Sequence, residues 1–177
     1  MTLWTNAPSR EAGSRSYKLM RTPPQTAIKA IILSEFPVGT QLHYHRGRTL
    51  PCNPQDCPAC KAGQKPRWKG YVYAMSESTR QIVIFEYTER AHETFERFIA
   101  TYGNCRGAKM TARRTGKRDN SPLLVTFDDG RVDGALLPSP EGLQLCLESM
   151  WEIRQQDIPM TNEVASLPYA PQQRFQA

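Results

Sequence analysis

Residues 68–87 read W-K-G-Y-V-Y-A-M-S-E-S-T-R-Q-I-V-I-F-E-Y, and this stretch predicts a β-hairpin. Residues 68–75 and 81–87 are rich in aromatic and β-branched side chains, which favour strands. The polar residues 76–80 between them suit the connecting turn. A mainly β fold is therefore expected around this hairpin.

Side chains alternate between the two faces of a strand, so Lys69, Tyr71 and Tyr73 share one face. Trp68 and Val72 share the other. We expect one face to join the core and the face with Lys69, Tyr71 and Tyr73 to line a groove. The alternative is that some of these aromatic side chains also belong to the core.

Outward from the hairpin, the pattern predicts further strands on both sides and two helices. Thr88 suits a helix N-cap, and Gly103 suits the end of that helix. Apolar residues at helical spacing predict a second, C-terminal helix. The expected strands are 27–36, 40–46, 107–115 and 122–128, the C-terminal helix is 140–156, and turns are expected at 37–39 and 128–131.

The loop before the hairpin carries the strongest chemical motif. Residues 43–60 read H-Y-H-R-G-R-T-L-P-C-N-P-Q-D-C-P-A-C, and three thiolates with one imidazole make a closed structural zinc site. Two histidines compete for one position, and alternation places both on the same strand face. The candidate ligands are His43, His45, Cys52, Cys57 and Cys60.

Two other interpretations of these cysteines stay open, namely free thiols and a redox pair at Cys57 and Cys60. A redox C-x-x-C normally opens a helix in a thioredoxin-like unit, whereas a Gly, Pro and Lys stretch follows here. Zinc is therefore the preferred interpretation. Cys105 and Cys146 are expected to be ordinary, partly buried thiols.

The 177 residues suit one domain with its own core, so zinc is expected to hold only one part of the chain. No apolar run approaches the roughly 20 residues of a membrane span, and the N-terminus lacks the apolar segment of a signal peptide. We expect a cytoplasmic protein of a prokaryotic or phage-infected cell, without a membrane partner. Five cysteines in a reducing compartment favour metal binding over disulfides.

The charge is uneven along the chain. Residues 1–118 hold 20 Lys and Arg against 8 Asp and Glu, whereas residues 119–177 hold 3 against 9. A basic body of this size favours a polyanionic partner, commonly nucleic acid, although a solvated surface without a ligand would look the same.

Basic residues surround the cysteine loop and interleave with aromatic ones, and a second basic patch covers residues 106–118. Proteins that bind single strands use cations along the phosphates and aromatic faces for the bases. A flexible charged hairpin without a ligand is the alternative for the second patch. The expected contacts are Arg46, Arg48, Lys65, Arg67, Trp68, Lys69, Tyr71, Tyr73, Lys109, Arg113, Arg114, Lys117 and Arg118.

The strand order matches an OB-fold, a five-stranded Greek-key barrel, if residues 27–46 form one long, bent first strand. With the cysteine motif, the chain resembles OB-fold single-stranded DNA-binding proteins that carry an inserted zinc subdomain, the phage T4 replication type. In that family a His followed by three Cys binds zinc, and His43 or His45, Cys52, Cys57 and Cys60 match that order. The loop is shorter here, the first two cysteines are closer, and the second histidine is extra.

The resemblance covers residues 27–128 and implies an OB-fold barrel with a zinc loop at 43–67 between its first two strands. A helix is expected between the third and fourth strands. The resemblance implies single-stranded DNA binding in replication, recombination or repair, a structural zinc ion, replication or repair proteins as partners, and no catalysis. Base stacking itself would accept RNA as well. The flanking parts are expected as a flexible arm at 1–26 that can dock at 17–20, a helical extension at 129–157 and a disordered tail at 158–177.

Two other functions remain open. A zinc-dependent nuclease would need a second metal or a free base, for which an unligated His45 is the nearby candidate. A deaminase is disfavoured because no H-x-E motif follows either histidine. A protein-interaction or inhibitor module could use the acidic residues spread through 119–163.

Overall fold

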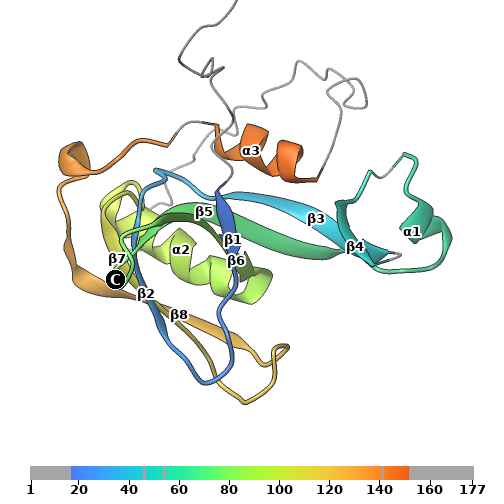
Figure 1. Ribbon diagram of the computed structural model, residues 1–177, viewed down its shortest axis with the longest axis horizontal. Coiled ribbons are helices and arrows are strands. Elements are labelled where there is room, and N and C mark those ends of the chain that lie inside the picture. Colours follow the sequence, from blue (N-terminus) through green and yellow to red (C-terminus); the bar gives the residue numbers. More distant parts are fainter. Residues whose placement is uncertain (1–16, 46, 54, 141, 152–177) are drawn as a thin grey trace, which may run out of the picture.

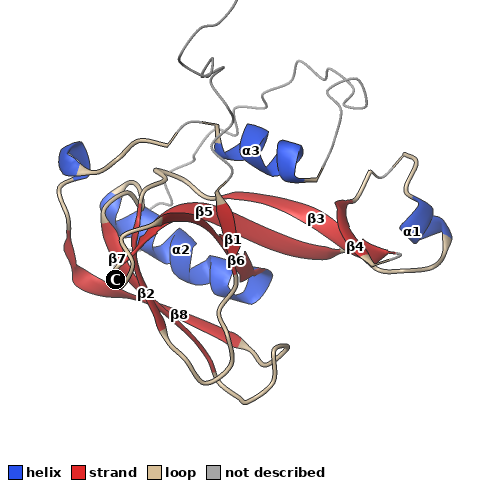
Figure 2. Cartoon of the chain, viewed as in Figure 1, coloured by secondary structure: helices blue, strands red, loops and turns tan. Residues whose placement is uncertain are grey.

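The computed structural model describes residues 17–151, apart from Arg46, Pro54 and Glu141. In this part of the chain, eight strands form one mixed sheet with helices packed around it (Figures 1 and 2). The mainly β fold is thus confirmed. The strands are β1 Lys18–Met20, β2 Ile28–Ile32, β3 Val38–His45, β4 Arg48–Pro51, β5 Arg67–Ser76, β6 Ile82–Thr88, β7 Ala108–Arg114 and β8 Leu123–Arg131. The helices are α1 Pro58–Lys61, α2 Glu89–Tyr102, the 3₁₀-helix η1 Gly134–Leu136 and α3 Leu143–Met150.

The predicted hairpin is present as β5 and β6, which pair antiparallel along the length of β6. The other edge of β5 is shared by two strands. β2 pairs with its C-terminal half and β3 with its N-terminal half, both antiparallel to it. Between them, the Leu33 N–H donates to the Tyr73 carbonyl at 2.8 Å. β2 and β3 are therefore two strands that follow one another along the same edge of β5, an arrangement that agrees with the option of a bent first strand at 27–46.

The sheet runs in the order β1-β6-β5-β2-β7-β8 and does not close into a barrel. The edge of β6 that faces away from β5 is occupied by β1, which pairs parallel to it. β8 pairs with β7, and no described strand joins β8 to β6. Within the expected flexible arm at 1–26, residues 18–20 are a strand of the sheet, which agrees with the expected docking at 17–20; residues 1–16 lie outside the described region.

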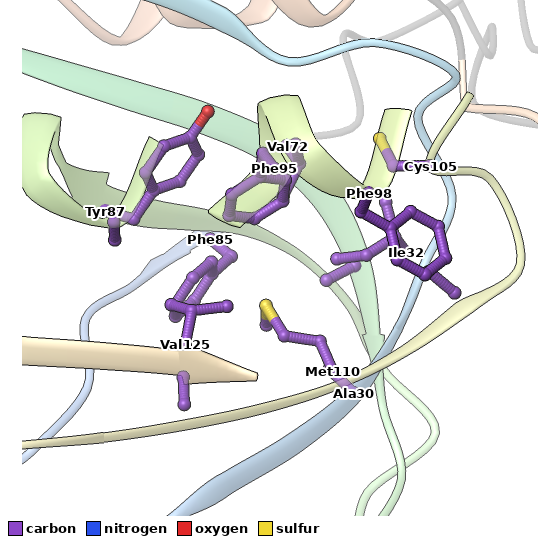
Figure 3. Close-up of a cluster of buried hydrophobic side chains, with 14 of the residues drawn as sticks. Ala30, Ile32, Val72, Phe85, Tyr87, Phe95, Phe98, Cys105, Met110 and Val125 are labelled. Carbon is purple, nitrogen blue, oxygen red and sulfur yellow. The ribbon is translucent and has the colours of Figure 1, made fainter. Parts of the chain in front are cut away.

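One hydrophobic core lies between α2 and the sheet (Figure 3). Phe95 and Phe98 of α2 pack against residues from β2, β5, β6, β7 and β8. The helix follows Thr88 and ends at Gly103, whose φ of +83° suits glycine. Both ends agree with the sequence prediction.

A second core covers the opposite face of the sheet. Tyr71, Tyr73 and Ile84 are buried there together with Leu137 and with Leu147 of α3. Figure 1 shows α3 lying over β5 and β3 on the side away from α2. Both faces of the central hairpin are therefore covered.

The C-terminal part differs from the prediction in two places. α3 is shorter than the expected helix 140–156, because it begins only after Gly142, whose φ is +60°, and ends at Met150. Residues 152–177, which include the expected tail, lie outside the described region. The turn expected at 128–131 belongs to β8, where a register shift absorbs the extra residues opposite β7.

β3, β4 and the start of β5 carry α1 at their tip (Figure 1). Leu42 of β3 still belongs to the second core, and Trp68 of β5 packs against the first. We call residues 38–69 the arm. In the described part of the chain, no helix combines the length and the apolar character that crossing a membrane requires.

Candidate metal centre and adjoining groove

Four side chains at the tip of the arm converge on one point. The ligand atoms of His43, Cys52, Cys57 and Cys60 all lie within 4.8 Å of one another. Cys60 Sγ is 3.2 Å from His43 Nε2 and 3.6 Å from Cys52 Sγ. Two thiolates on one tetrahedral ion at about 2.3 Å would be about 3.8 Å apart, so the cluster could hold a metal ion.

Three pieces of the chain build this centre. β3 supplies His43, and the Cys52 N–H donates to the Gln41 carbonyl at 2.8 Å, which fixes the end of β4 beside it. Cys57 and Cys60 sit at the start of α1 and within it, with Pro58 at the first helical position. Proline has the backbone dihedral that this position needs, so the C-P-A-C tetrapeptide presents both sulfurs from one turn.

The pKa values of the Cys57 and Cys52 thiols are shifted in opposite directions. Backbone N–H groups of Cys60 and Ala59 lower the pKa of the Cys57 thiol. Burial and the neighbouring thiols Cys60 and Cys57 raise the pKa of Cys52 to about 11. A metal ion would have to displace the Cys52 proton, as metal binding to thiols generally does.

The structure selects His43 over His45 as the fourth member. His43 is buried, with 3 % of its surface exposed, whereas His45 is not among the clustered residues. Residues two apart on one strand face are separated by roughly 6.6 Å, so only one imidazole reaches the cluster. The other ring nitrogen of His43, Nδ1, is buried and has no hydrogen-bond partner among the described residues.

An open groove of about 990 Å³ adjoins the arm. Its walls come from four separate segments: the arm, the β1–β2 loop, the start of α2, and the loop between β7 and β8. Lining residues include Arg21, Thr22, Tyr44, Arg67, Trp68, Lys69, Glu86, Thr88, Glu89, Arg90, Arg114, Asp119 and Ser121.

Two aromatic side chains stand in this groove. Trp68 packs on His92 at 4.7 Å and edge-on to Tyr87 at 5.9 Å between ring centroids. Its ring also lies against Gly39, where an added Cβ would be 2.0 Å from the Trp68 ring. Tyr44 is 72 % exposed, so its ring is open to a partner.

The cations of the groove are held in two ways. Arg21 Nε and Lys69 Nζ lie 3.1 and 3.3 Å from Glu86, a buried carboxylate to which the Tyr71 hydroxyl also donates. Arg114 instead donates to two carbonyl oxygens, those of Thr22 and Ser121, each at 2.7 Å. Carbonyls do not neutralise a guanidinium, so Arg114 leaves positive charge in the groove.

The predicted contact residues fall into three groups. Arg67, Trp68, Lys69 and Arg114 are brought together in the groove. Others are exposed or half-buried elsewhere: Lys65, Lys117 and Arg118 on loops, and Lys109 and Arg113 on the face of β7 opposite to the core residues Met110 and Ala112. Arg46 lies outside the described residues, and only the backbone of Arg48 is described.

Tyr71 and Tyr73 require a correction. They do share the face of β5 that carries Lys69, but they are only 1 % and 2 % exposed. Trp151 packs edge-on to Tyr71, and Tyr17 packs edge-on to Tyr73. This burial raises the pKa of both phenols, and neither ring has a free face on which a base could stack.

The groove residues that were missed from the sequence include Arg21, Tyr44 and Arg90. Arg21 lies in the segment expected to be a loose arm. Tyr44 lies between the two histidines in the sequence, and alternation gives it no function. Arg90 had only helix-start signals around it, so no sequence signal tied it to a ligand.

No family model, curated protein or solved structure matches this chain. The centre and the groove are therefore interpreted from their own geometry.

Proposed function

We propose that the protein binds single-stranded nucleic acid in the groove beside the arm, and that a structural zinc ion holds the arm in shape. The observation that carries the proposal is the combination of Tyr44 and Trp68 with Arg67, Lys69 and Arg114 in one open groove. Aromatic faces for bases and cations for phosphates are what sequence-tolerant single-strand binding requires.

The strand pairing supports an OB-fold origin for this groove. An OB-fold is a partly open barrel that binds oligonucleotides with its second and third strands and with the loops between strands 1 and 2 and strands 4 and 5. If β2 and β3 count as strand 1, those two loops are the cysteine loop and residues 115–122. The arm that carries the first loop and the second loop itself both line the groove.

The donor set supports zinc as the ion. Soft thiolates with one imidazole favour zinc over magnesium or calcium. Four protein ligands would fill a tetrahedral shell and leave no position for a substrate, which fits a structural role and no catalysis. Zinc would tie β3, the end of β4 and α1 together and so keep the arm rigid. The resemblance found in the sequence favours DNA as the ligand, and replication or repair proteins as partners.

The direct test is fluorescence anisotropy of a labelled 15-nucleotide dT strand against the zinc-loaded protein. The logarithm of the binding constant should fall steeply and linearly with the logarithm of the salt concentration, because neutralised phosphates release counterions. Absence of binding at low salt would reject the proposal. A denaturing gel of the same samples should show intact strand, which separates binding from nuclease activity, and an rU strand compares RNA with DNA.

Tyr44→Ala should weaken dT binding about 5-fold or more, since stacking of one base is worth roughly 1–3 kcal/mol. The matched control is Phe36→Ala, which removes another exposed aromatic ring, 56 % exposed, that does not line the groove. Equal effects of the two substitutions would contradict a specific role for Tyr44.

A further inference from the structure

The groove contains the start of α2, and this end of the helix is uncapped. Thr88 is the N-cap residue, but its side chain makes no capping hydrogen bond. Thr88, Glu89 and Arg90 all line the groove. The first N–H groups of a helix have no partner inside the helix and carry the positive end of its dipole, which suits an anion.

A second, independent feature lies in the same groove. Thr22 is 2 % exposed, and its hydroxyl has no hydrogen-bond partner among the described residues. A buried hydroxyl without a partner destabilises the fold, so its presence points to a partner that binds from outside the chain. Thr22 is one of the residues that line the groove.

The sheet brings the segment of Thr22 beside the strand that leads into α2. β1 runs parallel to β6 with Met20 opposite Phe85, and the next residue, Arg21, bonds to Glu86. Thr22 follows Arg21 directly, and both Thr22 and the N-cap Thr88 line the groove.

Arg114 completes the arrangement. Its Nε donates to the carbonyl of Thr22 itself and its Nη1 to that of Ser121. These two bonds fix the guanidinium beside Thr22, while Nη2 makes no hydrogen bond within the described residues. A fixed guanidinium with free N–H groups is a strong phosphate donor.

We propose that Thr22, Arg114 and the first turn of α2 form a binding subsite for one phosphate group. This inference rests on the proposed function and deepens it, because the phosphate would be that of the nucleic-acid strand. Its oxygens would accept from the Thr22 hydroxyl, from Arg114 and from the helix N–H groups. The carboxylates of Glu86, Glu89 and Asp119 also line the groove. Glu86 is paired with Arg21 and Lys69, whereas Glu89 and Asp119 are exposed and can turn toward solvent.

The subsite is testable without nucleic acid, by thermal unfolding of the zinc-loaded protein in inorganic phosphate against chloride of equal ionic strength. Phosphate should raise the Tm, because a ligand that binds only the folded state stabilises it. Thr22→Val keeps the volume and removes the unpartnered hydroxyl. Its Tm in chloride should be equal to or above that of the parent protein, and the increase caused by phosphate should be lost.

An unchanged or higher Tm in chloride, together with a lost response to phosphate, would show that the Thr22 hydroxyl serves binding and not folding. Arg114→Gln should also lose the increase caused by phosphate, whereas Arg118→Gln, an exposed residue of the same loop that does not line the groove, should retain it. A Thr22→Val protein that keeps the full phosphate effect would overturn the proposal, as would a parent protein that responds equally to phosphate and chloride.

Two kinds of strand phosphate could occupy the subsite, and dT strands with a 5′-phosphate or a 5′-hydroxyl distinguish them. If the subsite holds an internal phosphate, Thr22→Val should weaken the binding of both strands by about the same factor. If it holds a terminal phosphate, Thr22→Val should weaken the binding of the 5′-phosphorylated strand alone. Phosphate stabilisation that persists without any strand binding would reject the proposed function and leave the subsite standing; strand binding insensitive to Thr22→Val would reject the subsite alone.

Discussion

Two glycines decide how the aromatic side chains beside the groove are placed. Gly39 of β3 and Gly70 of β5 are paired across the two strands. The Trp68 ring occupies the space of a Gly39 side chain, and the Tyr87 ring occupies that of Gly70. The position of the Trp68 ring, which bases would meet, thus depends on the absence of a Cβ at Gly39, and the position of the buried Tyr87 ring depends on its absence at Gly70.

Gly39→Ala should therefore displace Trp68 and weaken dT binding. The new Cβ would lie 2.0 Å from Trp68 Cζ2, and overpacking of this kind typically costs about 1–3 kcal/mol of folding stability. Urea unfolding measures the stability and anisotropy measures the binding. Gly130→Ala is the control, since its Cβ would meet nothing within 4 Å; similar losses in both variants would refute the packing argument.

The metal centre makes a second prediction at the scale of single residues. His43→Ala should reduce bound zinc well below one ion per chain, because it removes a member of the cluster. His45→Ala should keep one zinc ion, as measured by mass spectrometry of the native protein or by elemental analysis. Loss of zinc from the His45 variant alone would show that the cluster is assembled differently in solution.

At the scale of elements, one arginine holds the segment between β8 and α3. Arg106 donates to the carbonyls of Leu33, Gly134, Leu137 and Pro138 and to the Ser139 hydroxyl. These bonds connect β2 to η1 and to the chain that leads into α3. They keep Leu137 and α3 over the face that buries Tyr71 and Tyr73.

Arg106→Ala should loosen this cover more than the sheet below it. Hydrogen bonds to a charged donor are worth about 1.5–3 kcal/mol each when lost with a buried partner, so hydrogen exchange should rise in residues 132–151. Exchange in β5 and β6 should rise much less. Arg97→Ala, an exposed arginine on α2, is the control, and equal exchange in the two variants would count against a clamp at Arg106.

Helices and strands could be predicted where their signals lie within one short stretch of sequence. The hairpin β5–β6 and α2 follow from alternation, helical spacing, Thr88 and Gly103. β1 could not be found this way, because three residues carry no periodicity and its pairing with β6 is distant in sequence. Alternation correctly placed Tyr71 and Tyr73 on one face, but it cannot tell that α3 covers that face.

At the scale of the whole molecule, the two hydrophobic cores and the candidate metal cluster lie in different places. Both cores lie between the sheet and its covering helices, while the cluster lies where β3, the end of β4 and α1 meet. Figure 1 shows α1 at the tip of the arm. Metal removal should therefore disorder the arm and leave the body folded.

Treatment with a strong chelator should abolish dT binding while a cooperative thermal transition remains. Re-addition of zinc should restore binding, and circular dichroism with anisotropy on the same samples follows both properties. Complete unfolding on chelation would mean that both cores depend on the bound metal ion. Unchanged dT binding would mean that the arm is not a wall of the site.

The candidate site shows the same division between local and distant information. The cysteine motif predicted the members of the candidate cluster, with the choice between His43 and His45 left open, because they lie within 18 residues, from His43 to Cys60. The groove collects Arg21, Trp68, Arg90 and Arg114 from four separate segments, so their meeting depends on strand order. The polyanionic partner expected from the sequence stays a prediction, and the sequence could not tell which cations line the groove.

The short strand β1 has a consequence for self-association. It covers one edge of β6 with only three residues, Lys18–Met20, and uncovered strand edges attract further strands. A chain that began at residue 27 would present that edge of β6 to solvent. Such a chain should form dimers or larger aggregates through edge-to-edge strand pairing, visible by light scattering, even though neither hydrophobic core has lost its central residues.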